Sequence, residues 1–244
     1  MAGTLYAGTS GFAYPTWAPR FYAPGARGDS LLAEYAGRLP AVELNNTFYR
    51  QPRPEPVAAW LAATPESFRF TAKAQRGASM RAFGAGAAAA VAWLTPPYRL
   101  FGERLGSVLL RVPDSVQRDD ARLAALLAAW PADIPLTLEF LHSSWVDDSV
   151  HAMLIEHGVV LCATDLDDAA PPDLRLTGSF VYLRLRRASY SAADLDAWAS
   201  RLAPFLADER DAYVFFRHDA DGEAALQALA LSERGYSASR PASW

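Results

Sequence analysis

The sequence predicts an α/β protein with a single-domain (β/α)8 barrel fold, the TIM barrel, with some irregularity. Short apolar or β-branched runs recur at regular intervals along the 244 residues, and helical patterns separate most of them. The length lies close to the roughly 250 residues that are typical of this fold. With 51% hydrophobic and 20% charged residues, the composition is that of a globular protein rather than a disordered or fibrous one.

Eight runs have the residue types of buried strands, rich in Val, Leu, Phe and Tyr and bounded by turn residues. We expect strands at residues 5–8, 41–44, 68–73, 107–112, 135–140, 158–165, 180–185 and 212–216.

Six amphipathic patterns between these runs predict helices, and several of them open with Ser or Asp at a plausible N-cap. We expect helices at residues 30–39, 54–63, 119–130, 147–158, 191–206 and 221–235. Gly158 and Gly235 are plausible C-caps for two of them. Residues 86–104 read as a helix that Pro96 and Pro97 break.

Nothing in the sequence divides the chain into smaller units. No linker or low-complexity tract is present, so we expect one domain over residues 1–244. A doubly wound open sheet is the competing fold, but it would need fewer strands and a Gly-rich first turn. No phosphate-binding loop of the Walker or dinucleotide type occurs, so no nucleotide cofactor is expected.

The overall charge and the termini indicate the class of partner. The net charge is −4, which favours neither nucleic acid nor an anionic membrane as partner. The one cysteine, Cys162, excludes internal disulfides and lies in an apolar run typical of a small buried side chain. The N-terminus lacks the features of a secretory signal, and no apolar stretch is long enough to span a bilayer. We expect a soluble cytoplasmic protein.

The basic residues are unusual, because only one of the 23, Lys73, is a lysine. A chain that uses arginine almost everywhere else suggests that a planar, permanently charged guanidinium fails at this position. The competing interpretation is chance retention at a tolerant site.

Strand alternation gathers charged residues inside the predicted barrel. Alternate residues of a strand face opposite sides, and the apolar side of a barrel strand packs against the helices. The inward set then holds charges late in their strands, namely Glu43, Lys73, Glu139 and Arg184, with Asp165 at the end of its strand.

Two interpretations of this inward cluster compete. It is either a buried salt-bridge network, because its acidic and basic groups nearly balance, or a ligand site at the end of the barrel where enzymes of this fold do chemistry. The ligand site is favoured, since a structural interior is built at lower energetic cost from Val and Leu.

Three kinds of chemistry fit the cluster. Lys73 can act as a base or as a Schiff-base amine if its pKa is lowered, although nearby glutamates would oppose this shift by stabilising the ammonium form. The carboxylates, with His142, offer oxygen-rich ligands for a divalent ion such as Mg²⁺ or Mn²⁺, although no metal-ligand spacing is diagnostic. Glu43 and Glu139 form an acid/base pair in a third interpretation, as in glycoside hydrolysis.

The loops at the barrel mouth add arginines and aromatic residues. Barrels often hold phosphate after their last two strands, where this sequence places Arg184, Arg186, Arg187, Arg217 and His218. Aromatic side chains follow other strands and would either stack on a sugar or base or pack as a lid: Tyr14, Trp17, Tyr49 and Trp145.

Several motifs resemble the YecE-like family, catalogued as domain of unknown function 72. They include GTSGFAYPTWAPRFYAPG from Gly8, VELNNTFYRQP from Val42, FRFTAKAQR from Phe68 and LEFLHSSW from Leu138, and the resemblance runs over about residues 8–236. It implies a TIM barrel but no established reaction. A distant similarity to endonuclease IV-like and sugar-isomerase-like barrels implies a phosphodiester or sugar substrate.

The resemblance also implies a set of site residues. Carried over by position, they are Thr9, Ser10, Glu43, Asn45, Thr47, Tyr49, Lys73, Glu139, His142, Trp145 and Arg184. The chain departs from the family pattern at the barrel mouth, with Leu141 in place of Arg, Arg186–Arg187 in place of His-Gly, and Arg217–His218 in place of Asn-Asn. We therefore expect a ligand preference that differs from that of typical members.

These observations lead to one preferred function and two alternatives. The preferred function is an enzyme that binds a small anionic ligand, bearing phosphate or carboxylate, or a sugar-like ligand at the barrel mouth. Glu43, Lys73 and Glu139 would carry its acid/base or metal-assisted chemistry. The alternatives are a nucleic-acid-binding or phosphodiester-processing protein and a non-catalytic metabolite-binding barrel.

Overall fold

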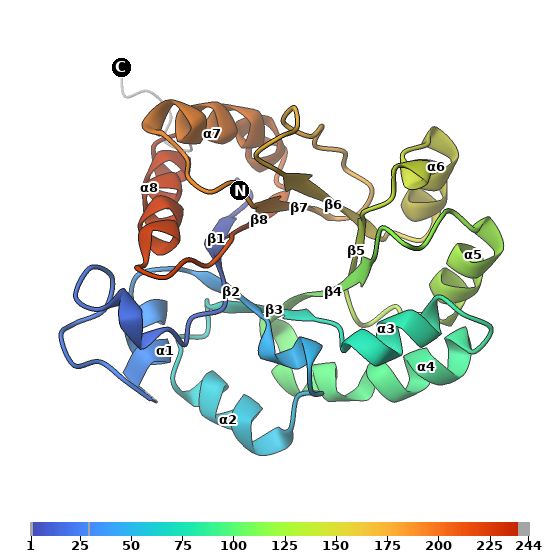
Figure 1. Cartoon of the computed structure of the whole chain (residues 1–244), viewed down its shortest axis with the longest axis horizontal. Coiled ribbons are helices and arrows are strands. Elements are labelled where there is room, and N and C mark those ends of the chain that lie inside the picture. Colours follow the sequence, from blue (N-terminus) through green and yellow to red (C-terminus); the bar gives the residue numbers. More distant parts are fainter. Residues whose placement is uncertain (1, 29, 239–244) are drawn as a thin grey trace.

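The computed structural model describes residues 2–28 and 30–238 and shows a closed barrel of eight parallel strands in a single domain. The strands pair in chain order, and β1 closes the barrel against β8 (Figure 1). Their bounds are Leu5–Ser10 for β1, Ala41–Leu44 for β2, Arg69–Lys73 for β3, Leu105–Val112 for β4, Leu136–Phe140 for β5, Val160–Asp165 for β6, Phe180–Leu185 for β7 and Asp211–Phe216 for β8. The predicted TIM barrel is confirmed.

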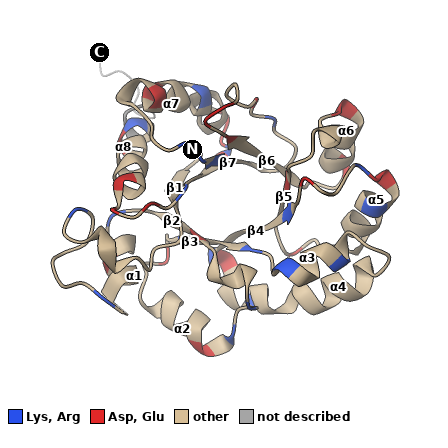
Figure 2. Ribbon diagram, viewed as in Figure 1, with Lys and Arg blue, Asp and Glu red and all other residues tan. Residues whose placement is uncertain are grey.

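The helices form a ring around the barrel (Figure 1). Their bounds are Ser30–Ala36 for α1, Pro54–Ala62 for α2, Arg76–Ala82 for α3, Ala87–Leu94 for α4, Asp120–Ala129 for α5, Asp148–Glu156 for α6, Ala192–Ala207 for α7 and Glu223–Ala238 for α8. Short 3-10 segments lie at Pro15–Trp17, Asn46–Phe48, Pro96–Arg104 and Ser143–Trp145. No helix of the described residues is both long and apolar enough to cross a membrane. Acidic and basic residues are interspersed over the outer helices (Figure 2).

The repeat is irregular in two places. Two helices, α3 and α4, lie between β3 and β4, and the described chain between β6 and β7 contains none. The predicted break is confirmed, because α4 ends at Leu94 and a 3-10 segment begins at Pro96. Proline cannot donate the backbone hydrogen bond that would continue the helix.

Polar side chains cap the N-termini of several helices. The Asp119 side chain accepts from the backbone of Arg122, and Ser191 and Asp194 form a reciprocal capping box at α7. Gly158 follows α6 with φ +64°, as a C-cap glycine does. The expected C-cap at Gly235 is wrong, because α8 continues past it. There a Cβ would lie 2.5 Å from the Leu5 side chain, so glycine lets α8 approach β1.

The strands separate two apolar cores, one between the barrel and the helices and one inside the barrel. Outward side chains such as Val42, Leu44 and Leu138 pack beneath the helices in the larger core. Inward side chains fill the lower barrel in a second, mostly aromatic core: Tyr6, Ala41, Leu109, Val160, Cys162, Phe180, Tyr182, Tyr213 and Phe215. The layer above this core, at the carboxyl ends of the strands, holds Glu43, Glu139 and Arg184. At the other end, Arg69 packs over the Tyr6 ring.

The hydroxyl of Tyr35 on α1 is inserted between β1 and β2. It accepts from the Thr9 backbone N–H at 2.8 Å and donates to the Ala41 carbonyl at 3.0 Å. Gly8 lies opposite Ala41 in the register, where a Cβ would collide with the Ala41 carbonyl oxygen. The close approach of β1 and β2 therefore requires glycine at this position.

We expect Gly8→Ala to lower the free energy of unfolding by about 1–3 kcal/mol, because the obstructing atom belongs to the backbone and cannot swing away. Gly37→Ala is the matched control, since its Cβ would meet only carbonyl oxygens at 3.5 Å. The control should change stability by less than about 0.5 kcal/mol. Urea denaturation of the two variants measures the difference, and equal losses would contradict the steric explanation.

Candidate functional site at the barrel mouth

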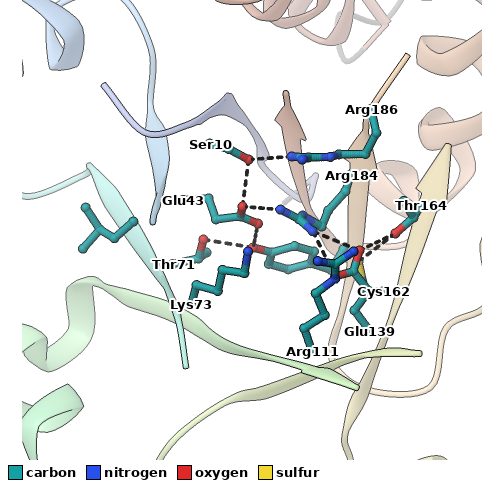
Figure 3. Close-up of polar contacts among 12 residues, drawn as sticks. Ser10, Glu43, Thr71, Lys73, Arg111, Glu139, Cys162, Thr164, Arg184 and Arg186 are labelled. Atoms are coloured by element: carbon teal, nitrogen blue, oxygen red, sulfur yellow. Dashed lines mark hydrogen bonds and ion pairs between the residues drawn. The ribbon is translucent and has the colours of Figure 1, made fainter. Parts of the chain in front are cut away.

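Arg184 on β7 joins two buried glutamates across the barrel (Figure 3). Its Nη2 donates to Glu43 Oε1 on β2 at 2.8 Å, and its Nη1 donates to both carboxylate oxygens of Glu139 on β5 at 2.9 Å. The three side chains are at most 2% exposed. We call this trio the arginine bridge.

Hydroxyl groups and a second arginine occupy the remaining acceptor positions of the two glutamates. Ser10 Oγ donates to Glu43 Oε1 at 2.7 Å, and Tyr182 Oη donates to Oε2 at 2.9 Å. Thr164 Oγ1 donates to Glu139 Oε1 at 2.8 Å, and Arg111 Nε lies 3.1 Å from Glu139 Oε2. Both carboxylates are thus held by several donors each, as buried charges must be.

The arginine bridge keeps both glutamates ionised. Burial alone would raise the pKa of Glu43, but Arg184 and the Ser10 hydroxyl outweigh it and lower that pKa from 4.5 to about 2. Burial likewise opposes ionisation of Glu139, whereas Arg184 and Arg111 lower its pKa. Neither carboxyl group holds a proton at neutral pH, so neither is suited to be a general acid.

Lys73 stands apart from these ion pairs. Its Nζ lies 4.4 Å from the centre of the Phe48 ring, and within residues 2–28 and 30–238 no carboxylate lies within ion-pair distance of it. Burial and the positive charge of Arg184 lower the pKa of Lys73 from 10.5 to about 8; Arg111 adds to this, and the two glutamates oppose it. Lys73 is therefore a cation that loses its proton easily.

Arg186 adds another positive charge to the mouth. Its Nη1 donates to Ser10 Oγ at 3.3 Å, and burial followed by repulsion from Arg184 lowers its pKa. Two ionised glutamates thus face four cations, namely Lys73, Arg111, Arg184 and Arg186. The cluster carries an excess of about two positive charges at neutral pH.

Tyr14, from the loop after β1, stacks on His218, from the loop after β8, with ring centres 5.0 Å apart. Burial, followed by repulsion from Arg186, lowers the pKa of His218. Burial raises the pKa of Tyr14, while a hydrogen bond with Asn45 and the charge of Arg186 oppose the rise. Tyr14 thus lies beside the cationic cluster.

An apolar cleft of about 490 Å³ opens beside this stack. Tyr14 and Asn45 form part of its wall, together with Phe12, Leu44 and Trp60. Ligand-sized clefts of this kind, mainly apolar with a few polar groups, are the usual form of small-molecule sites. Tyr14 links the two regions, because it lines the cleft and the charge of Arg186 acts on its hydroxyl group. None of the four cations of the cluster lines the cleft.

Asp165 does not lie in the inward cluster, so that expectation was wrong. Its Oδ1 accepts from Arg187 at 2.9 Å and its Oδ2 accepts from Tyr190 at 3.0 Å. The inward residues of β6 are Cys162 and Thr164, because Cys162 belongs to the interior core and Thr164 reaches Glu139. The sequence analysis placed Asp165 on the inward face of β6, but that face carries the preceding residue, Thr164.

Trp17 and Trp145 are buried rather than available for stacking on a ligand. Trp17 donates to the Asp219 carbonyl at 3.1 Å, and Trp145 stacks on Phe140 with ring centres 4.5 Å apart. Tyr49, by contrast, is 74% exposed. These three loop aromatics therefore divide between two buried packing positions and one surface position.

The other predicted residues have local partners. Thr9 donates to the Gly11 carbonyl and contacts Tyr35, and Thr47 donates to the Leu44 and Lys73 carbonyls. His142 accepts from the Ser144 backbone and caps a 3-10 segment, and Arg217 is exposed. Among the described residues, no group of three or more His, Cys, Asp or Glu side chains is arranged to hold a metal ion.

Three members of the cluster were missed from the sequence as site residues: Arg111, Thr164 and Tyr182. Strand alternation could have predicted that Arg111 points inward, because it shares a face of β4 with Ser107 and Leu109. Thr164 and Tyr182 lie on the inward faces of β6 and β7, where their hydroxyls reach the glutamates.

We expect Arg184→Met to lower the free energy of unfolding by about 3–5 kcal/mol, because two buried carboxylates lose their shared counter-ion. Arg122→Met is the matched control, since Arg122 is 55% exposed and forms a surface ion pair with Asp119. Its loss should stay below about 0.5 kcal/mol. A small loss in Arg184→Met, measured by urea denaturation, would show that the bridge contributes little to stability.

Acid should weaken the fold through Glu43. Its folded-state pKa lies below the unfolded value, so its contribution to stability is complete above about pH 4.5 and is lost as the pH falls towards about 2. Glu43→Gln should flatten this dependence in urea denaturation between pH 5 and pH 2. An unchanged slope in the variant would contradict the assignment to Glu43.

Comparison with known proteins agrees with this architecture. The family model described as "Protein of unknown function DUF72" matches residues 6–241. A DUF72 family protein of Thermotoga maritima has a crystal structure with a TM-score of 0.77 and 24% identity, over 94% of this chain and 98% of that one. One from Enterococcus faecalis has a TM-score of 0.77 and 20% identity, over 96% of each chain. No curated protein matches. The chain belongs to the DUF72 family.

Proposed function

We propose that this protein binds a small organic anion, bearing a carboxylate or phosphate, at the carboxyl ends of the barrel strands. The observation that carries the proposal is the excess of cations around the arginine bridge. Lys73 and Arg186 are half-buried, and neither forms an ion pair with a carboxylate of the described chain. A ligand anion would supply the missing negative charge.

A purely structural network does not account for the two extra cations. Both glutamates already accept several hydrogen bonds, which come from Arg184 and from the hydroxyl groups of Ser10, Tyr182 and Thr164. Adding Lys73 and Arg186 introduces repulsion, which contributes to the lowered pKa of each. Such unfavourable charge arrangements are characteristic of functional sites.

The geometry suggests a division of roles. Arg186 and Arg111 offer guanidinium groups, which suit the paired oxygens of a carboxylate or phosphate. Lys73, with a pKa of about 8, is suited to transfer a proton near neutral pH. Glu43 and Glu139 hold Arg184 in place, so we assign them a positioning role and not the acid/base role expected from the sequence.

The apolar cleft supports an organic body on the ligand. Its wall includes Tyr14 and Asn45, and Tyr14 lies within the field of Arg186. A ligand with its anion on Arg186 would extend past Tyr14 into the cleft. A sugar-like body would find few polar partners there, because the lining is mostly apolar.

A nucleic-acid function has less support. The buried Trp17 and Trp145 are not available to stack on bases, and the outer helices carry interspersed charges rather than a basic surface (Figure 2). A non-catalytic metabolite-binding barrel would share the same anion site without using Lys73 chemically. We propose a cytoplasmic location, where small organic anions are abundant.

Anion binding should appear as a concentration-dependent rise in the midpoint temperature of unfolding with inorganic phosphate or pyruvate. Arg186→Met should weaken binding about tenfold or more, because a charge-assisted hydrogen bond contributes about 1.5–3 kcal/mol. Arg122→Met, on the outer surface of α5, should bind as the unaltered protein does. No shift with any small anion, or tighter binding of single-stranded DNA with a steep salt dependence, would overturn the proposal.

A further inference from the structure

We infer that the Nζ atom of Lys73 forms a Schiff base with the carbonyl carbon of a small 2-oxo carboxylate. The inference rests on the proposed function, because the ligand's carboxylate would occupy the anion site beside Arg186. It goes further by assigning a covalent role to Lys73 and a carbonyl group to the ligand.

The first support is the position of the amine. Lys73 is the last residue of β3, and its side chain lies within the cluster of Figure 3. Its Nζ does not pair with an acid of the described chain but packs over the Phe48 ring, a contact that favours the ammonium form less strongly than an ion pair would. Glu43, the acid of neighbouring β2, is already engaged by Arg184, Ser10 and Tyr182. A carboxylate in direct contact would hold the amine protonated and unreactive.

The second support is the surrounding charge. A lysine that is desolvated beside other cations is the usual form of a Schiff-base nucleophile. Here burial and Arg184 favour loss of the proton, with a smaller effect from Arg111, against opposition from the two glutamates. With a pKa of about 8, roughly a tenth of the amine is neutral at pH 7.

The third support is the choice of residue. The chain has 23 basic residues, and only Lys73 is a lysine. A guanidinium would serve equally well as a counter-ion in this cluster, as Arg111, Arg184 and Arg186 do. It keeps its proton in proteins, whereas an amine can release it and attack a carbonyl group.

The position of the anion site sets the class of carbonyl compound. Arg186 contacts Ser10 Oγ, which itself donates to Glu43, and Lys73 lies in the same cluster (Figure 3). Both cations also lower the pKa of Glu43, so they lie around the same carboxylate. A small ligand with its carbonyl next to its anionic group can therefore contact both cations at once. A 2-oxo carboxylate has this arrangement.

The reaction is balanced without an oxidant or reductant. The neutral amine attacks the carbonyl carbon, a carbon–nitrogen bond forms, and the carbonyl oxygen gains a proton from the nitrogen. The second nitrogen proton then accompanies that oxygen as it leaves as water. The product is the imine, which is cationic when protonated, and the ligand's carboxylate offsets its charge.

Borohydride trapping tests the inference on the full-length protein. We expect pyruvate with sodium borohydride at pH 7.5 to attach one reduced carboxyethyl group to Lys73, identified by peptide mass spectrometry. The site is unambiguous, because the only other primary amine is the N-terminus, which lies in a separate peptide. Trapping should be at least about tenfold faster than in urea-unfolded protein, because the folded amine loses its proton more easily.

Matched controls separate the parts of the inference. Lys73→Arg, with its fold verified by circular dichroism, should give no adduct outside the N-terminal peptide. Acetone, which has a carbonyl but no anion, and lactate, which has the anion but no carbonyl, should leave Lys73 unmodified. Arg186→Met should slow trapping about tenfold, and Arg122→Met should not change it.

The outcomes distinguish this inference from the proposed function. Pyruvate binding that depends on Arg186 but yields no adduct on Lys73 would overturn the Schiff base and leave anion binding intact. Equal trapping in the folded and unfolded protein would also overturn it, since the amine would then have no special reactivity. Absence of any anion binding would overturn both.

Discussion

The salt bridges of Arg184 to Glu43 and Glu139 determine the character of the barrel mouth. They join β2, β5 and β7 across the interior and seal the aromatic core that contains Cys162, whose thiol pKa burial raises well above its usual value. Ionised glutamates at this depth persist only because several donors hold each of them. Because Arg184 occupies both acids, Lys73 and Arg186 have no carboxylate partner among the described residues. Stability and site electrostatics therefore depend on the same three side chains.

Filling a barrel with a buried charge network carries a large desolvation free energy. Apolar residues of similar volume would often give equal or greater stability, because desolvation offsets much of the attraction between buried charges. The network has a second effect that apolar packing lacks. Glu43 receives donors from β1 and β7, and Glu139 receives them from β4, β6 and β7. With the glutamates themselves on β2 and β5, these bonds connect six of the eight strands around the mouth.

Much of this could be predicted from the sequence, because strand alternation has a period of two. That period placed Glu43, Lys73, Glu139 and Arg184 on the inward face, and the structure brings them together. It failed at Asp165, where a shift of one residue moved a carboxylate to Arg187 and Tyr190. The burial of the loop tryptophans depends on tertiary packing, which no local pattern contains. The choice of acid that each cation pairs with also depends on the folded structure, because these residues are far apart in the sequence.

The two sequence interpretations of the cluster, a salt-bridge network and a ligand site, are compatible with each other. The network interpretation describes the arginine bridge well, since its groups satisfy one another. Because the glutamates are already paired with Arg184, Lys73 lies against Phe48 without a carboxylate partner among the described residues, and its pKa is lowered. A lysine placed among unpaired glutamates would keep its proton and be a poor nucleophile. In the proposed reaction, the arginine bridge is thus the condition under which Lys73 can act as a nucleophile, because it keeps both glutamates engaged elsewhere.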